Sequence, residues 1–256
     1  MKEKFLKAVE IFKEKTRKEC YKIVLVDGEP SITDNKLGGT PYLPIGCSYP
    51  LDSDGNPMGL ILQVDLKEVD LEGYPKVGIL QVYADAKGNW PMQYEIKYLR
   101  EGQEYRTDLP TIDDSAFYIV NPRKIKLEKA VAYMSFNDYR FFDIFCPILN
   151  EVFGTDLKNY GGVSDYFEEN GFDEWVDVLL DNIDSPSACI GGYPDFTQDD
   201  PRPLDRDLEE CLFKLDSVLS FDDIYIGDSG IMFCFISKKD IETCNFENAF
   251  LDWDCC

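Results

Sequence analysis

The sequence of 256 residues contains no histidine. This absence excludes Ser-His-Asp and Cys-His catalytic groups and every histidine-based metal site. It also removes the side chain whose pKa best suits proton transfer near neutral pH. Any catalysis would therefore depend on carboxylates, tyrosine, lysine, cysteine or a bound metal, and we expect a protein that is not an enzyme.

Long apolar runs are also absent, since no stretch approaches 18 consecutive apolar residues. This length is the minimum for a membrane-spanning helix, so we expect no membrane partner. Residues 1–7 (MKEKFLK) are charged and amphipathic, unlike the apolar core of a signal peptide. We therefore expect a cytoplasmic protein.

The nine cysteines include no Cys-x-x-Cys pair. Without such a pair or a histidine, no common zinc site can be assembled, and we expect neither a metal nor a cofactor. Cys146, Cys211 and Cys234 lie in apolar runs and are predicted to be small core residues. The adjacent Cys255 and Cys256 are candidates for exposed, reactive thiols.

Basic residues are scarce in the second half of the chain. Residues 1–128 carry 21 acidic and 18 basic side chains, whereas residues 129–256 carry 28 acidic and 8 basic ones. Such a field repels nucleic acid and anionic membranes and attracts cations or basic proteins. Two interpretations stay open: a solvated face that keeps the protein soluble, and a docking surface for a basic protein partner.

Three motifs occur twice, in the same order. Residues 37–42 (LGGTPY) return as 190–195 (IGGYPD), 60–65 (LILQVD) as 211–216 (CLFKLD), and 78–83 (GILQVY) as 230–235 (GIMFCF). The nearly constant spacing indicates an internal duplication. It predicts an α+β fold in which two related β-rich repeats with flanking helices pack as one pseudo-twofold domain.

Hydrophobic periodicity predicts the individual elements. We expect helices over residues 2–19, 138–152 and 173–183, a loop over 159–162, and strands over 21–26, 59–66, 77–85, 92–100, 115–120 and 127–136. These elements predict an N-terminal helix and strand over 1–34, followed by one domain over 35–256. Within that domain we expect repeat one at about 35–136, repeat two at about 188–240, and a helical connection between them.

Two motifs imitate known sites without completing them. Residues 227–230 (GDSG) resemble a serine nucleophile loop, but no histidine can act as the base, so a tight turn around Asp228 is the better interpretation. Residues 52–56 (DSDGN) resemble the start of an EF-hand loop. Pro57 and Gln63 occupy the positions where an EF-hand needs glycine and glutamate, so we expect a turn here too.

The duplicated Gly-Gly-x-Pro segments are predicted to be turns, because paired glycines permit positive φ. The turn residues are Gly38, Gly39, Pro41, Gly191, Gly192 and Pro194. The glycines either allow close backbone packing where the repeats meet, or line a shared cleft that a ligand or peptide enters.

Polar residues inside strand-like runs are candidates for a ligand or partner site. Gln63 and Asp65 match Lys214 and Asp216 in the second repeat. An alternating strand places polar side chains on its outward face, so solvent exposure is favoured, and an inward polar pocket is the alternative.

The segment 198–202 (QDDPR) is the best single candidate for a site. Arg202 either pairs with a neighbouring aspartate as a loop clamp or binds a carboxylate through both guanidinium nitrogens. With Tyr42 and the strand residues, the candidate ligand or partner site comprises Tyr42, Gln63, Asp65, Gln198, Asp199, Asp200 and Arg202.

Several spaced motifs together resemble the YwqG-like family, a bacterial group of domains of unknown function. They are residues 37–44 (LGGTPYLP), 54–58 (DGNPM), 73–81 (GYPKVGILQ), 191–198 (GGYPDFTQ) and 253–255 (WDC). The resemblance implies a mixed α+β fold with two related halves and no established reaction. Some relatives accompany secreted-toxin gene clusters, which implies an immunity role.

The leading hypothesis is a non-enzymatic acidic protein that binds a basic protein partner, with no nucleic-acid partner. The alternative is small-ligand or peptide binding, or carboxylate-based catalysis, in a cleft between the repeats. The oligomeric state is left open.

Overall fold

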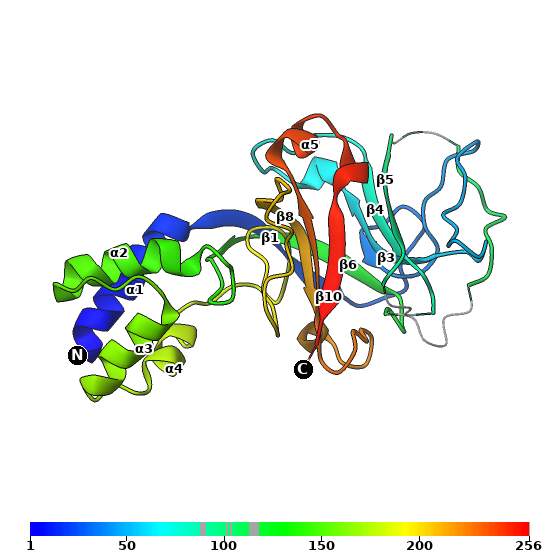
Figure 1. Ribbon diagram of the computed structural model, residues 1–256. Coiled ribbons are helices and arrows are strands. Elements are labelled where there is room, and N and C mark those ends of the chain that lie inside the picture. The colour runs from blue at the N-terminus through cyan, green and yellow to red at the C-terminus, as the bar shows by residue number, and fades with distance from the viewer. Residues whose placement is uncertain (88–90, 101, 103, 113–117, 256) are drawn as a thin grey trace.

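The protein consists of a curved β-sheet and a lobe of helices at one end of it (Figure 1). This computed structural model describes residues 1–256 except 88–90, 101, 103, 113–117 and 256. Over these described residues, no helix is long and apolar enough to cross a membrane. The mixed composition confirms the predicted α+β class.

The sheet has ten strands, and every pairing in it is antiparallel. Its order is β10-β9-β8-β7-β1-β6-β2-β3-β4-β5. The strands are β1 Lys18–Val26, β2 Lys36–Leu37, β3 Gly59–Asp65, β4 Ile79–Ala84, β5 Tyr94–Leu99, β6 Arg123–Ala132, β7 Ala188–Gly191, β8 Glu210–Asp216, β9 Ile231–Ile236 and β10 Phe250–Asp254.

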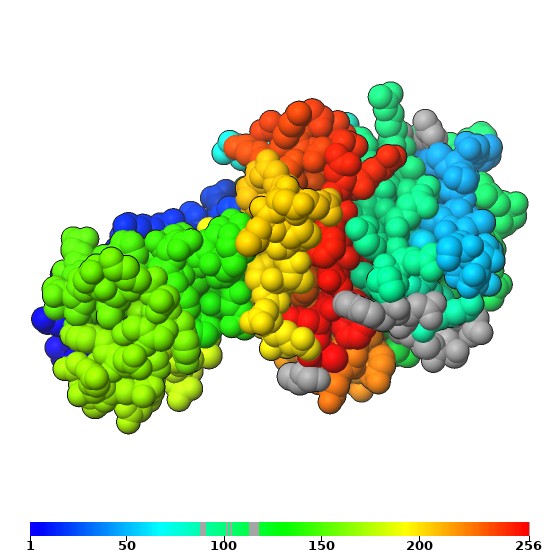
Figure 2. Space-filling model, in the orientation of Figure 1, coloured from blue at the N-terminus to red at the C-terminus, as the bar shows by residue number. Residues whose placement is uncertain are grey.

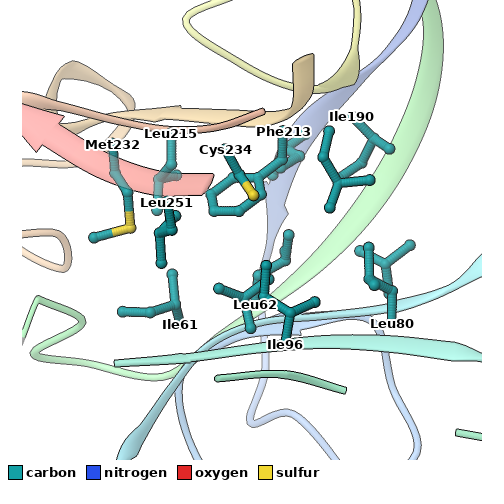
Figure 3. Close-up of a cluster of buried hydrophobic side chains, with 14 of the residues drawn as sticks. Ile61, Leu62, Leu80, Ile96, Ile190, Phe213, Leu215, Met232, Cys234 and Leu251 are labelled. Atoms are coloured by element: carbon teal, nitrogen blue, oxygen red, sulfur yellow. The ribbon is translucent and has the colours of Figure 1, made fainter. Parts of the chain in front are cut away.

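The two ends of the sheet curve toward each other and enclose the larger hydrophobic core. In Figure 3 the side chains of Ile61, Leu62 and Leu80 face those of Leu215 and Met232 across this core. The edges also touch, since the Tyr94 hydroxyl donates a hydrogen bond to the Ala249 carbonyl at 3.2 Å. The sheet therefore comes close to a closed barrel, and its inner face lines the larger core.

The helices of the lobe form a second core. They are α1 Lys2–Thr16, α2 Phe141–Phe153, α3 Tyr160–Glu169 and α4 Trp175–Leu180, whereas α5 Lys238–Glu242 and the short 3-10 helices η1 Leu66–Glu68, η2 Ser217–Leu219 and η3 Phe246–Asn248 accompany the sheet. Helix α1 packs against α2 and α4, and its buried face carries Phe5 and Phe12. Helix α2 contains Pro147 in its interior and continues through it.

Strand β1 lies in the middle of the sheet, between β6 and β7. Residues 18–26 thus belong to the same sheet as the strands after residue 35, although the predicted division at residue 34 stays a prediction. Of the expected strand over 115–120, residues 118–120 are described and contain one bridge, Ile119 to Ile224. Residues 115–117 lie outside the described residues.

The predicted loop over 159–162 is wrong, because these residues begin helix α3. Asn159 caps the helix, its side-chain oxygen accepting a hydrogen bond from the Gly162 amide at 3.0 Å. This cap satisfies an amide that the first helical turn leaves without a partner, so the helix begins despite two glycines.

Candidate functional site

Gln63 is a fully satisfied buried residue on β3. Its amide nitrogen donates to the carbonyls of Ile32 and Asp34, each at 2.9 Å. Its oxygen accepts from the Tyr42 amide at 2.8 Å and from the Gln81 side chain at 2.7 Å. All four bonds of this amide are therefore used, three to hold the 32–42 segment against the sheet and one to Gln81 on β4.

The predicted solvent exposure of these strand residues is wrong for three of the four. Gln63, Asp65 and Lys214 are buried, and only Asp216 is partly exposed. The reason is that both faces of β3 and β8 are covered, so no outward polar face exists. A run such as 60–64, apolar apart from Gln63, is typical of a strand buried on both sides.

Lys36 is a buried cation that sequence reasoning missed. Its ammonium donates to the carbonyls of Ser31, Ile32 and Thr40 at 2.5–2.9 Å. Burial lowers the pKa of Lys36 from 10.5 to about 8, with a smaller opposing effect of the Asp34 carboxylate. The carbonyl contacts place this lysine in a structural role beside the first Gly-Gly turn.

The lowered pKa of Lys36 predicts a pH dependence of stability. The unfolded chain binds a proton at this lysine up to about pH 10.5 and the folded one only to about pH 8, so deprotonation favours folding between these values. Relative to a Lys36→Met variant, the wild type should gain about 2–3 kcal/mol of unfolding free energy between about pH 8 and about pH 10. Urea denaturation across this range measures the difference.

The exposed Lys15 provides the matched control. A Lys15→Met variant should follow the wild-type pH profile, because no burial opposes its charge. Parallel profiles for wild type and Lys36→Met would contradict the burial cost assigned to Lys36.

Asp65 and Asp216 begin the same kind of short helix in the two halves. The Asp65 carboxylate accepts from the Lys67 amide at 3.0 Å and caps η1, and it also pairs with the Lys67 ammonium. The Asp216 carboxylate accepts from the Val218 amide at 2.9 Å and caps η2. Both carboxylates therefore act as local caps.

Arg202 lies at the centre of a buried ion-pair network. Its Nε is 2.9 Å from Asp200 Oδ1, and its Nη2 is 2.9 Å from Asp138 Oδ2. Arg140 binds the same Asp138 carboxylate through two nitrogens, at 2.8 and 2.6 Å. The Arg202 guanidinium also lies over the ring of Tyr139, 4.8 Å from its centroid.

This network joins the entrance of α2 to the 195–206 loop. The Asp138 side chain is fully buried, and burial alone would raise its pKa. Hydrogen bonds from Arg140 and the charge of Arg202 outweigh burial and hold the pKa of Asp138 below its usual value. The geometry matches the loop-clamp interpretation of Arg202, with Asp138 as a partner that the sequence did not reveal.

Gln198 and Asp199 lie apart from this network and are exposed. The Gln198 amide donates to the Asp254 carboxylate at 2.9 Å, and its side chain donates to the Cys255 carbonyl at 2.6 Å. The structure thus places Tyr42 with Gln63 in the first half and Asp200 with Arg202 in the second. It does not bring the seven candidate residues into one site.

Both Gly-Gly turns need glycine for conformation and for space. Gly38 and Gly39 have φ of 66° and 74°, and Gly191 and Gly192 have φ of 73° and 79°. A Cβ on Gly38 would lie 2.6 Å from Ile119, and one on Gly191 would lie 2.5 Å from Leu71. Close packing therefore accounts for these glycines, but Gly38 packs against its own half, whereas Gly191 packs against the other half, on Leu71.

Each turn also borders a cavity of its own. One cavity of about 370 Å³ is lined by Gly39, Thr40, Pro41 and Tyr49 among others. Another of about 420 Å³ is lined by Gly191, Gly192 and charged residues of β1, the 71–74 loop and α5. None of the seven candidate residues lines either cavity.

The two motifs that resemble an EF-hand loop and a serine nucleophile loop are turns. The Asp52 carboxylate accepts hydrogen bonds from the amides of Asp54 and Asn56 at 3.0 and 2.7 Å, so its oxygens serve the loop itself. Residues 227–229 form the turn around Asp228, with Ser229 at φ 60°. In the described part of the chain, no group of three or more cysteine, aspartate and glutamate side chains could hold a metal ion.

The acidic residues of the second half gather on the surface of the lobe. No lysine or arginine occurs between Lys158 and Arg202. Helices α3 and α4 and their flanks expose eight carboxylates, those of Asp165, Glu168, Glu169, Asp173, Glu174, Asp177, Asp181 and Asp184. These helices form the lower edge of the lobe in Figure 1. We call these eight residues the acidic face.

One family model matches a stretch of the chain that includes most of the sheet and the whole acidic face. The sequence model of the Domain of unknown function (DUF1963) matches residues 35–255. The chain belongs to this family. No curated protein matches the chain. The DUF1963 match includes strands β2 to β10 and helices α2 to α5, whereas α1 and β1 precede it.

Proposed function

We propose that the chain is a non-enzymatic binding protein whose acidic second half docks a basic protein partner. The acidic face carries this proposal, because eight exposed carboxylates lie together with no basic residue among them. Such a surface raises the association rate of a cationic protein and disfavours anionic ones. A cationic toxin neutralised by this chain is the class of partner that the YwqG-like resemblance suggests.

The interior of the protein gives further support. Gln63 and Arg202, the polar residues of greatest catalytic interest, use their donors and acceptors for internal bonds. A group that is committed in this way cannot also orient a substrate. The surface, with its unequal charge, is the better place to look for function.

The experiment is affinity capture with matched charge variants. In the face variant Asp165→Asn, Glu169→Gln, Asp173→Asn and Asp177→Asn remove four charges from the acidic face. In the control variant Asp27→Asn, Glu29→Gln, Asp54→Asn and Glu68→Gln remove the same charge from exposed positions of the first half. A basic protein should be retained by the wild type and by the control variant, and lost from the face variant.

Salt provides the second readout of this prediction. Retention should weaken steeply between about 0.1 M and about 1 M salt, because the screening length falls from about 10 Å to about 3 Å. A captured partner that is neutral or acidic, or one that the face variant retains as well as the wild type, would count against the proposal.

We also infer that the two halves are related by a pseudo-twofold axis between β1 and β6. The sheet order supports this, since β2-β3-β4-β5 on one side corresponds to β7-β8-β9-β10 on the other. The pairings β3–β4 and β8–β9 each contain a register shift after their first strand residues, at Leu60/Leu62 and Cys211/Phe213. In each half a capped 3-10 helix follows, η1 or η2.

A further inference from the structure

Helix η2 and the loop that follows it expose several large apolar side chains. Phe221 and Tyr225 are each 62% exposed, and Val218 is 54% exposed. Val120, half exposed, lies on the neighbouring segment. In Figure 2 this loop protrudes in orange at the lower end of the sheet. We call residues 217–229 together with Val120 the aromatic loop.

The aromatic loop is held firmly by backbone bonds. The Val120 amide donates to the Asp223 carbonyl at 2.8 Å, and the Tyr225 amide donates to the Tyr118 carbonyl at 2.7 Å. The Asp223 carboxylate accepts from the Ser220 hydroxyl and pairs with Arg123. A surface ordered before binding loses little conformational entropy when a partner covers it.

The charged side chains within residues 217–229 are all acidic, namely Asp222, Asp223 and Asp228. Asp222 and Asp228 are exposed within the loop, and the charge of Asp223 is offset by Arg123. Exposed aromatic groups bordered by carboxylates suit a partner with both apolar and cationic side chains.

The corresponding loop of the first half lacks this character. Residues 66–78 contain Lys67 and Lys76, which pair with Asp65 and Asp70. Among its large apolar side chains, Val77 alone is an exposed one. The scaffold is the same, so the aromatic and acidic side chains of the second loop are not required by the fold.

We propose that the aromatic loop is the docking surface for a basic, amphipathic segment of the protein partner. The apolar side chains of that segment cover Phe221 and Tyr225, and its lysines or arginines face Asp222 and Asp228. The proposal rests on the proposed function and adds to the acidic face of the lobe a second contact, an apolar and acidic one at the end of the sheet. Burial of two aromatic side chains at the centre supplies affinity, and the carboxylates supply selection for cations.

The experiment uses two synthetic probes on the full chain. One is a helical peptide of about 18 residues with lysine on one face and leucine on the other. The second has the same lysines with serine in place of leucine. Titration calorimetry at about 0.15 M salt compares the wild type with a Phe221→Ser/Tyr225→Ser variant. An Ile45→Ser/Val77→Ser variant removes equally exposed apolar groups from the first half and serves as control.

The expected result is tighter binding of the leucine peptide than of the serine peptide. The Phe221→Ser/Tyr225→Ser variant should bind the leucine peptide at least about tenfold more weakly than the wild type does. The control variant should lose less than about twofold in affinity. Circular dichroism and thermal unfolding establish that both variants fold, since the replaced side chains lie on the surface.

Three outcomes would overturn the proposal. If both peptides bind equally and the loop variant binds like the wild type, the docking surface is elsewhere while the acidic protein still binds cations. An equal loss in the control variant would show that the aromatic loop has no special role. If neither peptide binds, the proposed function fails together with the docking surface.

Discussion

Replacement of Arg202 by alanine is expected to lower the free energy of unfolding by about 3–5 kcal/mol. The variant leaves the Asp138 and Asp200 carboxylates nearly buried without the guanidinium that both contact. Arg140 still binds Asp138, but its two guanidinium bonds hold that carboxylate and not the 195–206 loop. Urea denaturation at neutral pH measures the loss.

The exposed Arg206 in the same loop is the matched control. Its guanidinium donates one bond to the Asn248 carbonyl at 2.7 Å, so an Arg206→Ala variant should lose less than about 1 kcal/mol. An Arg202→Ala variant as stable as Arg206→Ala would show that the network is not a clamp. A second variant, Arg202→Lys, should recover little, since an ammonium cannot bridge two carboxylates with the same fork geometry.

Much of the sheet could be predicted from the sequence because its signals are local. The strands over 59–66, 77–85 and 92–100 follow from apolar runs bounded by turn residues, and they match β3, β4 and β5 within two residues at each end. The paired glycines also predicted the two turns, because the ability to adopt positive φ belongs to glycine itself.

The burial of Gln63 and Lys214 could not be predicted from alternation, because their burial depends on what covers the outward face. The 32–42 segment supplies that cover in the first half. The Arg202 clamp was half predicted: the spacing to Asp200 is local, whereas Asp138 is distant in sequence. Only the folded topology brings the entrance of α2 to this loop.

The two halves share local features of the fold but differ in their exposed side chains. A capped 3-10 helix occurs in each half, with Asp65 as the cap of η1 and Asp216 as the cap of η2. Phe221 and Tyr225 differ from the residues of the first loop and remain largely exposed. Exposed aromatic side chains without a role in the fold favour an interaction surface.

Replacement of Phe5 by alanine is expected to lower the free energy of unfolding by about 3–5 kcal/mol. Phe5 is fully buried in α1, and its ring lies 5.1–6.3 Å from the rings of Phe145, Phe167, Phe172 and Trp175. These four residues belong to α2, α3, the following turn and α4. Loss of one ring therefore removes an edge-to-face contact with every other part of the lobe.

An exposed residue on the same helix, Lys7, is the control, and Lys7→Ala should change stability by less than about 0.5 kcal/mol. The core of the lobe continues onto Cys20, Ala132 and Cys189 of the sheet. The Phe5→Ala substitution should therefore lower the stability of both the lobe and the sheet. Coincident unfolding of lobe and sheet in the variant would show one cooperative unit that includes α1, although α1 precedes the DUF1963 match. Separate transitions, with the sheet as stable as in the wild type, would instead show that the lobe, with α1, unfolds independently of the sheet.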